Sequence, residues 1–269
     1  MERIQIGIPC GYNSELYVNF LLDSIRKTIS NTDRVQILLG QNKPGVDINY
    51  IVEKNTDFDV KVIQAFSKDI NSLGHAKCID VLFEHMNLKY GMIVDCDVAF
   101  LEKNWDIKLL NELQDNKVVI GAGTSIGHHH YYNFPFTIMI LFEVAPMREA
   151  GVSFMPLIEN GRLVEKTLTE KDAEIFGRNI GDKISLDTAW QLPLKLKATG
   201  YDGIALSLVT PRDHTLKDIK FMTPEMRGEE QQLNGIPFFT HVGRSATRPF
   251  NGPITSRWRA RVSEWIDGG

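Results

Sequence analysis

The sequence has few cysteines, no long apolar run and no excess of positive charge. Its 269 residues include only three cysteines, Cys10, Cys78 and Cys96, and none belongs to a Cys-x-x-Cys pair. This odd and scattered set argues against a disulfide framework and against a zinc site built from thiolates. We therefore expect the chain to fold in a reducing compartment.

No segment is long and apolar enough to cross a membrane. The run from Phe134 to Phe142 is too short to span a bilayer, and the opening residues 3–9 alternate like a strand and lack the apolar stretch of a signal peptide. The formal net charge of −4 and the pI near 6.0 favour neither nucleic acid nor an anionic membrane as a partner. We expect a cytoplasmic protein that acts on a small substrate.

The most informative segment is YGMIVDCDVAF, residues 90–100, in which an apolar strand ends at two aspartates. Asp95 and Asp97 are two residues apart, so in an extended chain their side chains leave the same face. Two carboxylates that close repel each other, and a divalent cation with a preference for oxygen ligands removes the repulsion. The alternative is a turn with two solvated carboxylates. We expect a metal site at the end of a central strand.

Strand and helix patterns alternate over the first hundred residues. A chain of this length with 43% hydrophobic residues can bury a sizeable core as one large domain. The patterns predict strands at Ile4–Ile8, Val35–Leu39, Val60–Ala65 and Met92–Val94, and helices at Ser14–Ser30, with Ser14 as N-cap, and Leu73–Met86. Such alternation predicts a mostly parallel α/β sheet covered on both faces, with ligands beyond the carboxyl ends of the strands. The two aspartates lie at that edge.

The second half is less regular, and residues 151–181 give no clear prediction. Between Thr210 and Asn234 the chain is polar and charged, which is typical of a mobile loop or lid. The patterns elsewhere predict helices at Asp106–Leu113, Ile184–Thr199 (where Pro193 must begin or kink the helix) and Arg257–Ile266, and strands at Val118–Gly121, Phe136–Phe142, Tyr201–Val209 and Phe238–Thr240.

Five segments in this order resemble the glycosyltransferases of the GT-A fold, particularly the family-two type. They are IQIGIPCGYNS, LGHAKCIDVLFEH, YGMIVDCDVAF, LDTAW and FFTHVGRS, and they extend from Ile4 to about Arg248. The resemblance implies a Rossmann-like α/β domain over residues 1–269. Residues 1–101 would form its nucleotide-sugar-binding half, and residues 102–269 its acceptor-side half with a C-terminal helix.

The resemblance also implies a reaction and a cofactor. A sugar would move from a nucleotide-diphosphate donor, with a UDP-sugar favoured, to an unidentified glycan, lipid or protein acceptor, with inversion. Mn2+ or Mg2+ would neutralise the diphosphate that leaves. Asp95 would lie near the ribose and the metal, Asp97 would bind the metal directly, and His241 would complete the metal ligands.

Further site residues follow from the same resemblance. Asp187 would be the catalytic base near the start of a late helix, although an N-cap role is compatible with this position and Asp182 is a second candidate. The candidate donor contacts are Pro9, Gly11, Tyr12, Asn13, His75, Lys77, Asp95, Arg244 and Arg248. Side-chain chemistry and position, and not the resemblance, give the candidate contacts to acceptor or donor sugar: aromatic rings stack on sugar faces and imidazoles bond to hydroxyls, as His128, His129, His130, Tyr131, Tyr132 and Trp190 could.

Two other functions stay open at this point. A nucleotidyltransferase that activates sugars needs a glycine-rich triphosphate loop with a basic residue after the first strand, and IPCGYNS is not such a loop. A catalytically silent module would keep the fold and the nucleotide but lack the chemistry. The presence of Asp95, Asp97 and His241 argues against the silent module.

Overall fold

The computed structural model describes residues 2–69, 71–124, 130–211, 218–223, 225–243 and 247–268. Its first half contains β1 (Ile4–Cys10), α1 (Glu15–Thr28), the 3-10 turn η1 (Thr32–Arg34), β2 (Val35–Gln41), α2 (Ile48–Lys54), β3 (Asp59–Gln64), α3 (Asn71–His85), β4 (Tyr90–Val94) and β5 (Val98–Phe100). Its second half contains α4 (Trp105–Glu112), β6 (Lys117–Ala122), β7 (Phe136–Glu143), α5 (Val144–Glu149), β8 (Ile158–Glu159), β9 (Arg162–Leu163), β10 (Glu165–Thr167), α6 (Glu170–Phe176), β11 (Lys183–Ser185), α7 (Leu192–Ala198), β12 (Asp202–Ala205), β13 (Ser207–Val209), β14 (Glu229–Leu233), β15 (Ile236–His241) and α8 (Pro253–Gly268).

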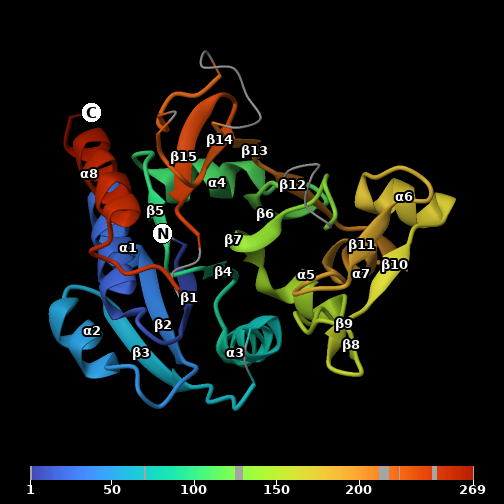
Figure 1. The fold of residues 1–269 in the computed structure, drawn as a ribbon, viewed down its shortest axis with the longest axis horizontal. Coiled ribbons are helices and arrows are strands. Elements are labelled where there is room, and N and C mark those ends of the chain that lie inside the picture. The colour runs from blue at the N-terminus through green and yellow to red at the C-terminus, as the bar shows by residue number, and fades with distance from the viewer. Residues whose placement is uncertain are drawn as a thin grey trace.

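A seven-stranded sheet in the order β12-β6-β7-β4-β1-β2-β3 forms the centre of the molecule (Figure 1). Its strands are parallel except for β7, which runs antiparallel to both β4 and β6. The predicted mostly parallel α/β sheet is therefore confirmed. Parallel neighbours place the ends of β1, β2, β3 and β4 at one edge, where the loops that follow them gather.

Both faces of the central strands are buried, because successive residues of β4 and β7 alternate between two hydrophobic cores. In β4, Met92 and Val94 belong to one core and Ile93 belongs to the other. The first core also receives side chains of α1, α4 and α8, and the second receives those of α3, α6 and α7. The apolar run that ends at Asp95 is thus the sequence of a strand covered on two sides.

Helix α3 lies very close to the sheet. A Cβ atom at Gly40 of β2 would lie 2.6 Å from the Cys78 sulfur of α3, and one at Gly7 of β1 would lie 3.0 Å from Cε of Met86, the residue directly after α3. Only residues without a side chain fit at such an approach. This packing fixes α3 relative to β1 and β2, and with it the position of His75 in the first turns of the helix.

A second sheet, antiparallel and in the order β13-β14-β15-β5, lies beside the first (Figure 1). Strand β5 begins directly after Asp97 and was not predicted as a separate strand. Strand β14 falls inside the segment 210–234, for which a mobile loop was predicted. That prediction is wrong for β14, whose Glu230 and Gln231 are fully buried; residues 212–217 and 224 lie outside the described residues.

Two further elements differ from the sequence prediction. Helix α2 was not predicted at all, although Asp47 caps it by accepting a hydrogen bond from Tyr50 N. The predicted helix Ile184–Thr199 is wrong, because β11 covers its start and α7 begins only at Leu192. Between them Ala189 has a φ of +64°, which no α-helix contains, and Pro193 stands in the first turn of α7, where proline is tolerated.

The C-terminal helix α8 packs along α1 on one side of the molecule (Figure 1). Its buried residues are Thr255, Trp258, Val262 and Ile266, which recur at helical spacing as the sequence predicts. Over the part of the chain that the structure describes, no helix is both long and apolar enough to cross a membrane.

A buried ion pair joins the start of β2 to α4. Arg34 Nη1 lies 2.5 Å from Asp106 Oδ2, and Ser30 donates to the same carboxylate through its backbone N and its Oγ. We expect Asp106→Ala to lower the free energy of unfolding by about 3–5 kcal/mol, because it leaves the Arg34 guanidinium buried without its partner. Chemical denaturation measures this loss. Asp59→Ala, which removes the exposed pair with Arg3, should cost at most about 1 kcal/mol; equal losses would contradict the prediction.

Candidate metal and nucleotide site

Backbone hydrogen bonds fix the turn that carries the two aspartates. Asp95 N donates to Ile138 O of β7 at 2.9 Å, so Asp95 extends the pairing of the large sheet. The Asp97 carbonyl accepts from Val242 N at 3.1 Å, just beyond β15 in the small sheet. The turn therefore crosses from one sheet to the other, and each aspartate is held at the edge of a different sheet.

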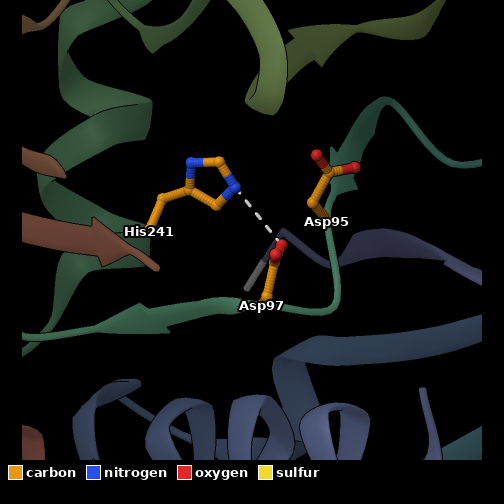
Figure 2. A group of neighbouring side chains, drawn as sticks. All are labelled: Asp95, Asp97 and His241. Atoms are coloured by element: carbon orange, nitrogen blue, oxygen red, sulfur yellow. Dashed lines mark ion pairs between the residues drawn. The ribbon is translucent and has the colours of Figure 1, made fainter. Parts of the chain in front are cut away.

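Strand register brings His241 to these aspartates. In the antiparallel pair of β15 and β5, His241 lies opposite Val98, the residue after Asp97. His241 Nε2 lies 3.3 Å from Asp97 Oδ1, and one ligand atom from each of Asp95, Asp97 and His241 lies within 4.8 Å of the others. Figure 2 shows the imidazole directed at Asp97, with the Asp95 carboxylate across the same space. The three residues predicted as metal ligands are thus brought together.

The other nitrogen of the His241 ring contacts a residue that was not predicted for the site. Glu229 of β14 lies opposite His241 in the small sheet, and its Oε2 is 3.2 Å from His241 Nδ1. Burial alone would lower the pKa of His241, but the carboxylates of Asp97 and Glu229 outweigh it and raise the pKa well above its ordinary value.

His75 faces the same cluster from α3. Its Nε2 lies 3.3 Å from Asp95 Oδ1. Burial lowers the pKa of His75, whereas Asp95 and, more weakly, Asp97 and Asp187 raise it, and the net shift is upward. Asp187 therefore lies within electrostatic range of the His75 ring.

The donor atoms suit a divalent cation. Asp95 Oδ1 is buried and, among the described residues, has no hydrogen-bond partner despite its contact with His75. A buried carboxylate oxygen without such a bond is costly, and a bound cation would satisfy it. Two carboxylates and one imidazole leave further coordination positions for ligand oxygens, which fits Mn2+ or Mg2+.

Asp187 stands in a turn and not at a helix N-cap. Its Oδ1 accepts from Thr188 N at 2.7 Å, and Trp190 N donates to the Asp187 carbonyl at 3.0 Å. The predicted capping role is wrong because α7 starts five residues later, with Gln191 at its N-cap. The left-handed Ala189 in this turn is a strained conformation of the kind that gathers at functional sites.

The alternative base, Asp182, serves a local turn. Its Oδ2 accepts from Asn179 N at 3.1 Å, and its carbonyl accepts from Leu168 N. Asp187, in contrast, is one of the carboxylates that raise the pKa of His75.

The predicted donor loop lies at the end of β1. Pro9 is buried as part of the strand, whereas Tyr12 is 57% exposed and Asn13 is exposed with a φ of +59°. A Cβ atom at Gly11 would meet nothing within 4 Å, so a ligand can approach this backbone closely. Ser14 occupies the N-cap position of α1 as predicted, but its hydroxyl donates to Gly11 O.

Asn42, directly after β2, is a further candidate site residue that the sequence analysis did not predict. Its backbone N donates to Cys10 O and its carbonyl accepts from Ser67 N, so it joins the loops after β1, β2 and β3. Its side chain is 7% exposed, and Oδ1 is buried with no hydrogen-bond partner among the described residues. The sequence did contain a signal for Asn42, because it is a polar residue directly after a buried strand. The same pattern led to the prediction of Asp95 as a site residue.

Two of the basic residues predicted to contact the donor have other partners in the described part of the chain. Lys77 forms an ion pair with Asp69 and is not directed at the aspartates by any described contact. Arg248 donates from Nη1 to Val242 O at 2.6 Å, which ties the chain after β15 to the end of that strand. Arg244 lies outside the described residues.

Of the residues expected to contact the acceptor or the donor sugar, only some are accessible to a ligand. Tyr131 is 2% exposed and donates to Pro135 O, so it cannot stack on a sugar and its predicted role is wrong. Tyr132 is 41% exposed, and the His130 ring stacks on Phe136. Trp190 is half-buried, with an indole N–H that has no partner among the described residues. His128 and His129 lie outside the described residues.

The fold is that of known glycosyltransferases. The mannosyltransferase PcManGT from Pyrobaculum calidifontis, in complex with GDP-Man and Mn2+, is similar over 76% of this chain and 54% of its own, with a TM-score of 0.51 and 13% sequence identity. TarS 1–349 of S. aureus, in complex with UDP-GlcNAc, is similar over 56% of this chain and 48% of its own, with a TM-score of 0.44 and 17% identity. The chain thus spans about half the length of these structures.

No family model and no curated protein matches the sequence. The similarity to PcManGT therefore rests on structure, and it shows a GT-A-like fold for this chain. The fold expected from the five sequence segments is confirmed.

Proposed function

We propose that this GT-A-fold chain is a metal-dependent glycosyltransferase that moves a sugar from a nucleoside-diphosphate donor to an acceptor. The observation that supports this most is the cluster of Asp95, Asp97 and His241 at the carboxyl end of β4. Ligands of open α/β sheets bind at that edge. The occurrence of GDP-Man and Mn2+ together in the PcManGT complex is consistent with such a site.

Asp95, Asp97 and His241 would hold the metal ion. A bound divalent ion would offset the negative charge that develops on the leaving diphosphate. We favour Mn2+ over Mg2+ because an imidazole nitrogen is among the ligands, and nitrogen ligands suit Mn2+ better than the harder Mg2+. The buried position of Asp97, which is 3% exposed, shields this charge pairing from water.

The nucleoside would lie against the loops that follow β1 and β2. Gly11 leaves room for close approach of the ligand, and Tyr12 presents an exposed ring for stacking on the base. Asn42 Oδ1 would accept from an N–H group of the base, which would satisfy an atom that is otherwise buried without a partner. A UDP-sugar remains the favoured donor, with a GDP-sugar as the second candidate.

Asp187 would act as the base. It would take the proton from the acceptor hydroxyl while the hydroxyl oxygen attacks the anomeric carbon from the face opposite the diphosphate, which inverts the configuration. Within the turn over residues 187–190, Thr188 N donates to Asp187 Oδ1 at 2.7 Å and orients the carboxylate, and Asp187 is one of the carboxylates that raise the pKa of His75. Trp190, three residues on, would contact the acceptor or the transferred sugar.

Thermal unfolding in the presence of Mn2+ and nucleoside diphosphates tests this function. A diphosphate that binds the native chain at 100 times its Kd should stabilise it by about 2.7 kcal/mol. We expect UDP or GDP to raise the melting temperature with Mn2+ present, and we expect a smaller rise with Mg2+. The matching nucleosides without phosphate are the control. If no diphosphate raises the melting temperature, the proposed function is wrong.

A further inference from the structure

One carboxylate contacts the His241 ring through the nitrogen that does not face Asp97. Glu229 Oε2 lies 3.2 Å from His241 Nδ1, on the side of the ring away from Asp97. Both partners are shielded, with side-chain exposures of 14% for His241 and 19% for Glu229. A hydrogen bond between a shielded imidazole and a carboxylate is charge-assisted and stronger than a neutral one.

The hairpin of β14 and β15 fixes this pairing through its backbone. Asn234 and Gly235 both have positive φ, as in the type I′ turns that favour Asn-Gly. A bulge between Gln231 and Gln232 shifts the register, and beyond it Glu229 stands directly opposite His241. Thr240 Oγ1 donates to Glu229 O at 2.8 Å and holds the residue in place.

Glu230 has a different task from its neighbour. It is fully buried and accepts from Phe221 N at 2.9 Å and from Met222 N at 3.0 Å, so it anchors the segment before β14. Successive residues of a strand face opposite sides. Glu230 is thus structural. Glu229 faces the other side of the strand, where its side chain contacts His241, one of the three candidate metal ligands.

We infer that Glu229 is a positioning residue for the metal site. By accepting the hydrogen bond of Nδ1–H it fixes the ring orientation and the tautomer of His241, and this presents the lone pair of Nε2 to the space shared with Asp95 and Asp97. The carboxylate also increases the basicity of the imidazole as a ligand. This inference rests on the proposed function, because it requires that the cluster binds a divalent cation.

The expected effect falls on metal affinity. Loss of a carboxylate that supports a metal-binding histidine costs about 10–100-fold in affinity. We expect Glu229→Ala to weaken Mn2+ binding by that factor, and we expect Glu229→Gln to weaken it less, because the amide oxygen still accepts from Nδ1–H but carries no charge. Glu264→Gln removes the same charge from an exposed position on α8, where Glu264 pairs with Arg261 and not with His241, and should leave Mn2+ affinity unchanged.

Titration of the full chain with Mn2+ alone, followed by electron paramagnetic resonance of the free ion, measures these affinities without substrate. Melting temperatures of the same proteins show whether a variant is folded. A second readout is the 15N spectrum of the histidine rings in the Mg2+-loaded protein. It should show His241 protonated on Nδ1 in the wild type and in Glu229→Gln, and should lose this single tautomer in Glu229→Ala.

The outcomes separate the inference from the function on which it rests. If the wild type binds no Mn2+, the proposed metal site itself is wrong. If the wild type binds Mn2+ and folded Glu229→Ala binds it with equal affinity and an unchanged His241 tautomer, Glu229 has no positioning role and the inference is overturned. The graded loss in Glu229→Gln and Glu229→Ala, with Glu264→Gln unaffected, supports it.

Discussion

Asp97→Asn should abolish the Mn2+-dependent stabilisation by nucleoside diphosphates. Asp97 is the most buried of the three candidate ligands, and the substitution replaces a charged oxygen ligand with a neutral amide that binds hard cations weakly. It also removes the ion pair with His241. We expect no shift in melting temperature on addition of Mn2+ and UDP or GDP, where the wild type shows one.

Asp115→Asn is the matched control for this experiment. Asp115 is exposed and has a φ of +55°, a conformation that asparagine adopts readily, so the same chemical change should leave both the fold and the ligand response intact. An Asp97→Asn protein that keeps the full metal-dependent shift would remove Asp97 from the metal ligands. A protein that loses the shift only because it unfolds would show a broad or absent transition without ligand.

Asp187→Asn should keep nucleotide binding and lose turnover. Removal of a general base lowers the rate by about 10²–10⁴-fold, because the acceptor hydroxyl must then be deprotonated by water. The side chain of asparagine has the same shape, and it can still accept from Thr188 N, so the turn should persist. Release of UDP or GDP from a panel of nucleotide sugars in Mn2+ measures turnover, and thermal shift measures binding.

Asp182→Asn distinguishes the two candidate bases. Asp182 accepts from Asn179 N within its own turn, and its substitution should change turnover little. If Asp182→Asn stops the reaction while Asp187→Asn does not, the base role belongs to Asp182. If both variants retain full turnover, a carboxylate from another segment removes the proton.

The central strands of the first half follow from the sequence because they are buried on both faces. A run such as Tyr90–Val94 has few alternatives to a central strand, and the helix patterns between such runs imply parallel order. Short elements with weak hydrophobic patterns were not predicted from the sequence. Helix α2 has seven residues, and β5 has three, which is too little for periodicity to distinguish them from loops.

The segment around Asp187 misled the sequence analysis for a local reason. Residues with good helix propensity surround it, yet Ala189 adopts a left-handed φ that only the tertiary structure enforces. Its backbone N donates to Phe154 O, far away in the sequence. Helix propensity is a weak preference, and this long-range contact outweighs it.

The three candidate metal ligands were predictable from the sequence, but the contact of Glu229 with His241 was not predicted. The two-residue spacing of Asp95 and Asp97 is visible in the sequence, and His241 directly follows an apolar run. Glu229 could have been found from the Asn-Gly pair, which predicts a hairpin between its strand and that of His241. The bulge that places Glu229 opposite His241 changes the strand register by one residue, and no local sequence pattern predicts this bulge.

The turn from Asp95 to Asp97 joins two sheets, so the candidate metal site is complete only after both sheets have formed within the chain. The turn between β4 and β5 carries both aspartates, but His241 reaches them only when β15, which lies about 140 residues further along the chain, has paired with β5. A cation held by Asp97 and His241 would cross-link segments that are distant in sequence, as a clip that closes a long loop does. Tight metal binding would then indicate that β15 has paired with β5.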